Sequence, residues 1–167
     1  MQHLRQIEQF AHNALQKYNL TADGWSFRWD RARRRFGSCD YGRRQITLSV
    51  HLARINTLAQ CMDTVLHEVA HAIAGQAAGH GPAWKEACRL VGAQPERCYT
   101  ADEVKQPPSK YVRYCPSCGH ATPLYRRSRK MYACGKCCKK HNKGRFSSKY
   151  LLKTVKRSEY TETIDSV

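Results

Sequence analysis

The 167-residue sequence predicts an α+β fold: a mixed helix-and-sheet domain followed by a small β ribbon held together by a metal ion. Three observations predict it. Two histidines stand four residues apart in an apolar helical pattern, residues 58–73. Three short alternating segments precede them within residues 25–50. Two CxxC pairs follow in the last third of the chain.

The first fifty residues predict one helix and a small antiparallel sheet. Apolar residues recur at helical spacing over residues 2–18. Apolar side chains alternate in residues 25–29, 36–40 and 44–50, as in half-buried strands. The turn between the first two strands is strongly basic and contains Arg31, Arg33, Arg34 and Arg35. These arginines form either an exposed loop or a second contact with phosphate.

The helix that follows carries the most informative motif, His67-Glu68-Val69-Ala70-His71. On a helix, His67 and His71 lie on one face, one turn apart, and can bind one zinc ion. Glu68 is then placed as the general base that takes a proton from water. The apolar residues lie largely on the opposite flank, so one flank packs into the core and the other faces a cleft. They are Leu58, Met62, Val65, Val69, Ala72 and Ile73.

A catalytic zinc ion normally has three protein ligands, and His80 is the favoured third. Two glycines and a proline around His80 predict a tight turn. Pro82 suits the first turn of a second helix, which Gly92 ends. This helix–turn–helix arrangement brings His80 back towards the histidine pair. The alternatives are that His80 is an exposed loop residue, or that Glu86 is the third ligand.

The two CxxC pairs predict a second, structural zinc site. Cys115, Cys118, Cys134 and Cys137 have the spacing that closes a tetrahedral site in a small two-hairpin ribbon. Such a ribbon lacks a core of its own, so the metal supplies its folding free energy. Cys138 competes with Cys137 as the fourth ligand. We expect the other cysteines to pack as small apolar groups; they are Cys39, Cys61, Cys88 and Cys98.

The charge distribution predicts a polyanionic partner. Residues 1–103 carry 13 basic and 10 acidic side chains, whereas residues 104–158 carry 16 basic and no acidic ones. A solvated surface usually mixes the two signs. Aromatic rings alternate with these cations, and rings can stack on unpaired bases while cations neutralise phosphates. Some of the tyrosines alternatively form the core of the ribbon, and no residue excludes RNA. The residues expected to bind nucleic acid are Arg113, Tyr125, Arg126, Arg127, Arg129, Lys130, Tyr132, Lys136, Lys139 and Lys140.

Composition and segment boundaries complete the prediction. We expect a catalytic domain over residues 1–103, a zinc-ribbon nucleic-acid-binding subdomain over residues 104–140 and a basic C-terminal tail over residues 141–167. A linker with Pro107-Pro108 spans residues 100–110. No long apolar run or secretory signal is present. We therefore expect no membrane partner, and a cytoplasmic, reducing location in which thiols stay free.

These motifs, taken together and in this order, resemble the SprT/Spartan family of zinc metalloproteases over most of residues 5–140. The motifs that carry the resemblance are Trp25-Ser26-Phe27-Arg28, Phe36-Gly37-Ser38-Cys39, Ile46-Thr47-Leu48-Ser49, His67-Glu68-Val69-Ala70-His71 and Gly79-His80-Gly81-Pro82-Ala83-Trp84. The resemblance implies a zincin-like metalloprotease domain in which His67, His71 and His80 bind zinc and Glu68 is the general base. It also implies proteolysis controlled by DNA, since Spartan-type members degrade proteins crosslinked to DNA.

The leading hypothesis is therefore a DNA-dependent zinc endopeptidase with two zinc ions, one catalytic and one structural. Its partners would be single-stranded or distorted DNA and DNA-bound protein substrates. We expect a monomer associated with DNA, in the nucleoid or, in a eukaryote, in the nucleus. Two alternatives stay open: a nucleic-acid-binding adaptor with an inactive metal site, and a zinc peptidase for a dedicated protein that DNA does not control. The spacing of the motifs identifies no oxyanion-stabilising residue.

Overall fold

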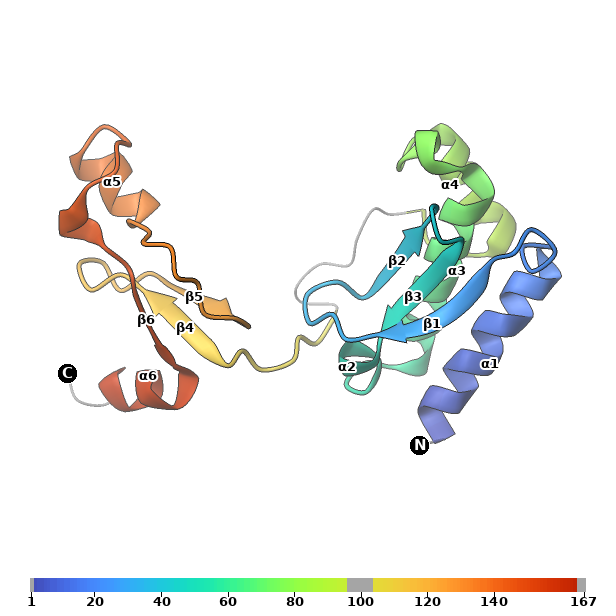
Figure 1. Ribbon diagram of the computed structural model, residues 1–167, viewed down its shortest axis with the longest axis horizontal. Helices are drawn as coiled ribbons and strands as arrows, with labels where there is room; N and C mark the ends of the chain where they lie inside the picture. The colour runs from blue at the N-terminus through green and yellow to red at the C-terminus, as the bar shows by residue number, and fades with distance from the viewer. Residues whose placement is uncertain (1, 96–103, 165–167) are drawn as a thin grey trace. The chain divides into compact units, whose positions relative to one another are not determined.

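The computed structural model describes residues 2–95 and 104–164 of the chain (Figure 1). The chain folds into two units, Met1–Pro107 and Pro108–Val167, which divide within the predicted linker. Cys98 and linker residues 100–103 lie outside the described residues.

A three-stranded sheet forms the centre of the first unit, and its strand order differs from the prediction. The strands are β1 (Ser26–Asp30), β2 (Gly37–Asp40) and β3 (Gln45–Ser49), and β3 lies in the middle. β2 pairs with β3 in antiparallel orientation as expected, but β1 pairs with β3 in parallel. The expectation of an antiparallel sheet was thus wrong for β1. The loop after β1 is long enough to cross the end of β3, so β2 returns on the far side.

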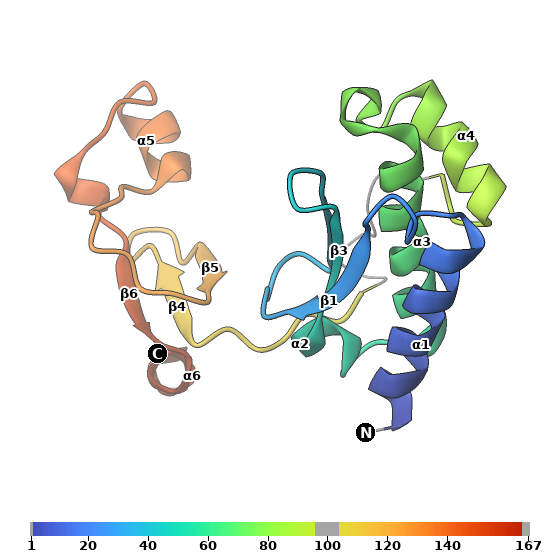
Figure 2. The ribbon, with the colours of Figure 1, turned by 45° about the vertical axis from the view of Figure 1, so that its right-hand side comes forward.

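The helices of the first unit cover one face of this sheet (Figure 2). Helix α1 (Gln2–Lys17) packs against β1 and α3 (Leu58–Ala74), and α3 packs against β2 and β3. Strand alternation places Phe27, Ile46 and Leu48 on the covered face, where all three are buried. Because Gly37 pairs with Leu48, Gly37 also faces the helices. The core therefore lies between the sheet and α3, directly behind the histidine pair.

The predicted boundaries of α3 and of α4 (Pro82–Val91) are confirmed, and local chemistry explains them. Thr57 caps α3 in a capping box with Gln60, which typically adds about 1 kcal/mol to stability. Gly75 ends α3 with a positive φ of 81°. Pro82 stands in the first turn of α4, and Gly92 ends it in a left-handed conformation, φ 81°. A short helix, α2 (Val50–Ala53), and a 3₁₀ turn, η1 (Gln76–Ala78), complete the unit.

The second unit is a three-stranded antiparallel sheet with a helix that carries the second CxxC pair. Strand β4 (Tyr111–Tyr114) pairs with β5 (Ala121–Leu124) on one side and with β6 (Lys153–Lys156) on the other. The first CxxC pair lies in the turn between β4 and β5. The second lies at the start of α5 (Gly135–His141), so the expectation of a two-hairpin ribbon was wrong for this half. Short elements η2 (Ser148–Tyr150) and α6 (Arg157–Ile164) flank β6.

The segment 141–167 is not merely a tail. Its residues 153–156 form β6 and complete the ribbon sheet, so the prediction of a separate basic tail was wrong there. Around Thr154 and Val155 the sequence lacks the strong alternation of apolar side chains that would have predicted a strand. Across the described residues, no helix has both the length and the apolar character needed to span a membrane.

Candidate metal centres

Three imidazoles meet at the end of α3. His67 and His71 project from one face of α3, and His80 returns from the turn before α4, as predicted. One ring nitrogen from each of the three lies within 4.8 Å of the other two. The Nε2 atoms of His71 and His80 are 3.2 Å apart. Two nitrogens bound tetrahedrally to one zinc ion would lie roughly 3.3 Å apart, so this spacing fits zinc.

The protonation of His67 and His71 also suits a metal. Burial, and then the charge of His80, lowers the pKa of His67 to about 4. Burial, and then the neighbouring imidazoles, lowers the pKa of His71 to about 4. Both rings are therefore neutral at pH 7 and offer lone pairs, as a zinc ligand must.

Trp84 is the common support of this group. Its indole is fully buried at the start of α4. It stacks on His71 with ring centroids 5.2 Å apart, and meets His67 and His80 edge-on at 4.9 and 4.6 Å. The apolar stripe of α4 predicted a buried Trp84 but not this contact with all three rings. The Gly79–Trp84 motif was the sequence signal that could have indicated this contact.

Glu68 lies beside the histidines on the buried side of α3, where only 7% of it is exposed. Burial raises the pKa of Glu68 to about 8, while Arg35 acts to lower it and Asp30 to raise it. Without a cation nearby, the carboxyl group is largely protonated at pH 7. A bound divalent cation would favour its ionised form, since an opposite charge nearby lowers a carboxyl pKa.

Strand β2 holds Glu68 from the opposite side. A Cβ atom on Gly37 would lie 2.7 Å from Oε1 of Glu68 and 2.9 Å from Cγ2 of Thr64. Only glycine allows this close approach, which explains why the Phe36–Cys39 motif has glycine at position 37. Further along the chain, the Tyr41 hydroxyl donates a hydrogen bond to the His71 carbonyl oxygen at 3.1 Å. Sequence reasoning identified neither Gly37 nor Tyr41 as part of the site.

The structure does not support the other candidates around this centre. Glu86 is exposed and pairs with Arg89 at 2.6 Å, so the alternative of Glu86 as a ligand is wrong. Cys61 and Cys88 are fully buried in the core, and Cys39 packs partly buried against it, as expected. Burial, and then the charge of Glu68, raises the pKa of Cys39 to about 12, which leaves an unreactive thiol. A surface hollow of about 510 Å³ is lined by His80 and by the first turns of α4.

Four thiols form the second candidate centre, in the ribbon. The Sγ atoms of Cys115, Cys118, Cys134 and Cys137 lie within 4.8 Å of one another. Two of the pairs are each 3.7 Å apart. Sulfur atoms bound tetrahedrally to one zinc ion would lie roughly 3.8 Å apart. Cys138 is buried in α5 but does not belong to the group, which favours Cys137 as the fourth ligand. Cys115, Cys134 and Cys137, packed with Tyr150 and Leu152, make a very small core, as expected for a metal-dependent fold.

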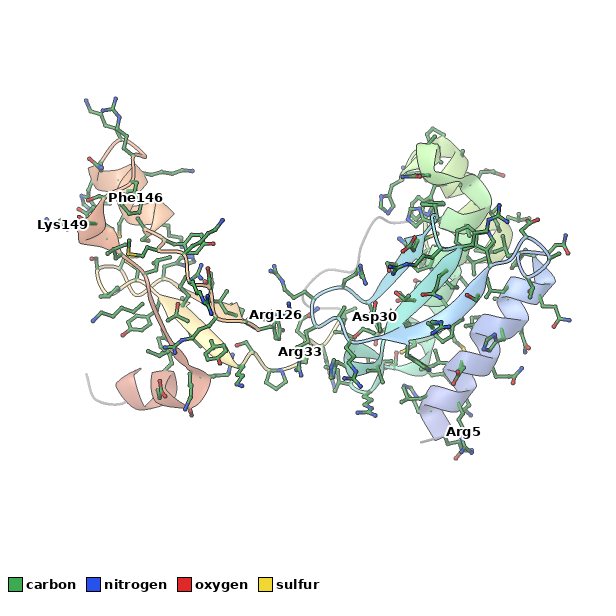
Figure 3. All side chains as sticks on the ribbon, in the orientation of Figure 1. Arg5, Asp30, Arg33, Arg126, Phe146 and Lys149 are labelled. Atoms are coloured by element: carbon green, nitrogen blue, oxygen red, sulfur yellow. The ribbon has the colours of Figure 1, made fainter. Side chains whose placement is uncertain are left out.

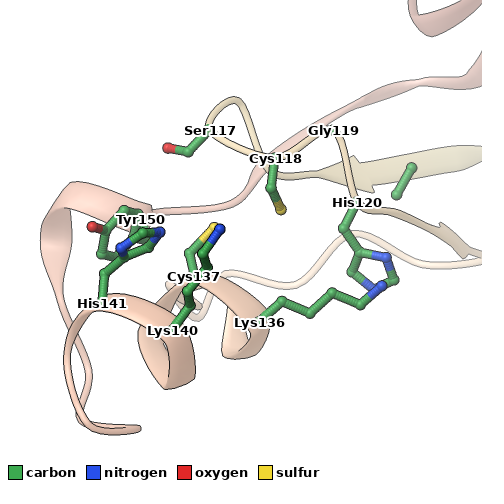
Figure 4. A pocket seen from close by; sticks show the side chains of 10 residues that line it. Ser117, Cys118, Gly119, His120, Lys136, Cys137, Lys140, His141 and Tyr150 are labelled. Atoms are coloured by element: carbon green, nitrogen blue, oxygen red, sulfur yellow. The ribbon is translucent and has the colours of Figure 1, made fainter.

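A basic pocket of about 520 Å³ lies beside these thiols (Figure 4). Ser117, Cys118 and His120 line it from the first CxxC turn. Lys136, Lys140 and His141 line it from α5. The rings of His141 and Tyr150, a further lining residue, stack at 5.7 Å. Its lining residues include no carboxylate, so the pocket suits an anionic ligand. The sequence identified Lys136 and Lys140, but not the two histidines.

The other residues predicted to bind nucleic acid lie on the ribbon surface. Five basic ones are exposed: Arg126, Arg127, Arg129, Lys130 and Lys139. Arg113 is half-buried, and its guanidinium lies 4.2 Å from the centroid of the Tyr132 ring. Tyr132 is 42% exposed and can stack on a further ring, whereas Tyr125 is half-buried. The structure brings Lys136 and Lys140 together in one pocket and Arg113 and Tyr132 together in one stack.

Two histidines and a buried glutamate lie on one helix, and a third histidine joins them from the following turn. This is the arrangement of a metalloprotease-type domain. The comparison with protein families gives the particular family. The model of the SprT-like family matches residues 4–105, more than half of the chain, and the chain belongs to that family.

Two curated relatives have similar sequences. Protein SprT of Pseudomonas fluorescens strain Pf-5 is 35% identical over 91 residues, which cover 51% of this chain and 56% of the relative. Protein SprT of strain Pf0-1 is 34% identical over 99 residues, which cover 52% of this chain and 60% of the relative. The chain thus spans less than two thirds of the length of either relative. No solved structure matches it.

Proposed function

We propose that this chain is a DNA-dependent zinc endopeptidase that cleaves proteins bound or crosslinked to DNA. The observation that carries the proposal is the group of three imidazoles with one buried glutamate, in a chain that continues into an acid-free basic stretch, residues 104–158. Membership of the SprT-like family supports the metalloprotease chemistry. The proposal that DNA controls this activity is supported by the basic, acid-free sequence of the ribbon.

An open coordination position supports an enzyme over a structural site. Among the described residues, the His67, His71 and His80 group includes no fourth His, Cys, Asp or Glu ligand atom. A structural zinc site is normally closed by four protein ligands, whereas a catalytic site leaves one position for water or substrate. This difference counts against the adaptor with an inactive metal site.

The residues of the chain divide the reaction between them. Zinc, when held by the three histidines, supplies a Lewis acid that polarises the scissile carbonyl and makes water more acidic. Glu68 accepts the proton of the attacking water and passes it to the leaving amine. Gly37 keeps Glu68 in place, and Trp84 fixes the three rings, so both act through other residues.

The ribbon supports nucleic acid as the controlling partner. Its pocket of about 520 Å³ holds two lysines, two histidines and a tyrosine on the surface of one unit. Phosphates bind to such cations mainly by charge, and a free base can stack on an exposed ring. Single-stranded or distorted DNA offers both groups at once, because its bases are not paired.

The test is cleavage of a DNA-binding protein and of the chain itself, with and without single-stranded DNA. Glu68→Gln is expected to lower cleavage at least 100-fold with zinc still bound, which general-base chemistry of this kind accounts for. Glu86→Gln is the matched control, because Glu86 is an exposed glutamate outside the histidine group. Undiminished cleavage by zinc-loaded Glu68→Gln protein contradicts the proposal. Equal cleavage with and without DNA instead indicates a peptidase for a dedicated protein.

A further inference from the structure

The basic loop between β1 and β2 is fixed in place by hydrogen bonds. Asp30 accepts bonds from the Ala32 backbone N–H at 2.8 Å and from the Arg35 guanidinium at 2.7 Å. Thr47 of β3 donates a third bond to Asp30 at 2.8 Å. The Phe36 carbonyl accepts a bond from the Ser49 N–H at 2.7 Å. The loop is therefore anchored at both ends to the carboxyl end of β3, and Figure 3 labels Asp30 and Arg33 in it.

Three arginines of this loop have no acidic partner among the residues that the structure describes. Arg35 pairs with Asp30, whereas no ion pair within residues 2–95 or 104–160 joins Arg31, Arg33 or Arg34 to a carboxylate. All three are exposed. Burial, and then the charges of Arg33, Arg54 and Arg31, lowers the pKa of nearby His51. Arg31, Arg33 and Arg54 thus all lie near His51, where their positive charges add.

The same loop is close to the candidate catalytic glutamate. Phe36 ends the loop, and the next residue, Gly37, contacts Glu68 directly across the sheet–helix interface. A polyanion held by Arg31, Arg33 and Arg34 would therefore be bound by the loop that leads into the strand packed against Glu68.

We propose that Arg31, Arg33 and Arg34 form a nucleic-acid contact site in the catalytic unit itself, separate from the ribbon. It rests on the proposed function and deepens it, because it assigns phosphates of the activating DNA to the loop that leads into Gly37, the residue packed against Glu68. Guanidinium groups bind phosphate oxygens through paired hydrogen bonds. An anchored loop loses little conformational freedom on binding, which favours affinity. Nucleic acid is the partner that fits both this loop and the acid-free ribbon of the same chain.

The first test measures the salt dependence of binding of the full chain to a fluorescent single-stranded oligonucleotide. The variant Arg31→Ser/Arg33→Ser/Arg34→Ser leaves the Asp30–Arg35 pair intact. Its log–log slope is expected to become shallower by about 2, because each phosphate contact on a single strand contributes roughly 0.7. The control Arg5→Ser/Lys17→Ser/Arg43→Ser removes the same charge from exposed positions elsewhere on the unit. Equal slopes for the two variants overturn the proposal.

The second test follows hydrogen exchange of residues 31–36 in the full chain. Addition of the oligonucleotide is expected to slow exchange there, and a polyglutamate peptide at equal charge is expected to have no effect. Protection by polyglutamate alone overturns the proposal in favour of an acidic protein partner. Neither test requires proteolysis, so a chain that binds at this loop but cleaves nothing disproves the protease and leaves the contact site standing.

Discussion

Gly37 shows how much of this site depends on a missing side chain. Its Cα approaches α3 so closely that any Cβ would meet both Glu68 and Thr64. The strand comes very close to α3 here, since Gly37 lies on the covered face opposite Leu48. The Glu68 carboxyl group is thus packed directly against the backbone of β2.

Gly37→Ala is expected to lower peptidase activity at least tenfold without loss of bound zinc. The new methyl group must push Glu68 or Thr64 aside, and overpacking of this kind typically costs about 1–3 kcal/mol of stability. Activity, zinc content and urea denaturation measure the three effects. Gly42→Ala is the matched control, because its Cβ meets only Asp40 at 3.5 Å. Equal activity of the two variants would show that Gly37 has no positioning role.

The raised pKa of Glu68 predicts how the stability of the metal-free first unit depends on pH. Its folded pKa of about 8 exceeds the reference value of 4.5, so the folded state binds the extra proton and stability falls as pH rises through this range. His67 and His71, with pKa values lowered to about 4, act in the opposite direction, but only below their reference value of 6.5. Between pH 6.5 and 8, therefore, only the titration of Glu68 among these three residues changes the stability.

We therefore expect the metal-free unit to lose roughly 2 kcal/mol of stability between pH 6.5 and pH 8, at about 1.4 kcal/mol per pH unit. Urea denaturation followed by tryptophan fluorescence measures this unit alone, because all three tryptophans, Trp25, Trp29 and Trp84, belong to it. Glu68→Gln should abolish the loss, whereas Glu86→Gln should retain it. A flat profile for the unmodified chain would mean that Glu68 titrates normally.

Among the elements, α3, the turn and α4 together make the histidine centre. α3 supplies two ligands, the turn supplies the third, and α4 supplies the indole on which all three rest. Proline at the start of α4 and positive φ at Gly79 set the return of the chain. The ribbon uses its elements differently, because its sheet and α5 have only a few buried side chains besides the thiols.

Removal of metal is therefore expected to unfold the ribbon unit and to leave the first unit folded. Cys134→Ser should have the same effect without a chelator, since it removes one of the four clustered thiols. Cys138→Ser, a neighbouring buried cysteine outside the cluster, is the control and should keep the ribbon folded. Amide NMR or limited proteolysis distinguishes the units. If Cys138→Ser unfolds the ribbon instead, the ligand assignment is wrong.

In the whole molecule, a SprT-like unit of nearly balanced charge is joined to a strongly cationic ribbon. Residues 1–103 have 13 basic and 10 acidic side chains, against 16 and none in residues 104–158. A protease of broad specificity is hazardous to its cell. Requiring a nucleic-acid partner confines such an enzyme to proteins that are already on DNA.

The affinity of the full chain for single-stranded DNA is expected to fall steeply with salt, and the ribbon pocket should account for part of the slope. Lys136→Ser/Lys140→Ser removes two pocket cations and should make the slope shallower by roughly 1. Fluorescence anisotropy between low and moderate salt measures it, with Arg5→Ser/Lys17→Ser as the control. Binding that does not change with salt would contradict the phosphate-based interface.

The sequence alone predicted which candidate metal-binding side chains the structure brings together, and most of the elements, because these depend on short-range spacing. Histidines four apart meet on a helix, CxxC pairs close a thiolate site, and caps such as Thr57, Pro82 and Gly92 set helix ends within a few residues. The resemblance to the SprT/Spartan family, confirmed as membership of the SprT-like family, rests on the same local motifs.

Only the tertiary structure decided which strands are neighbours, and which residues pack against the candidate site residues. The parallel pairing of β1, the contribution of β6 to the ribbon, and the contacts of Gly37 and Trp84 all join residues that are distant in sequence. Alternation shows which face of a strand is buried but not which neighbour it takes. Such contacts are set by how the elements pack, so they appear only once the chain has folded.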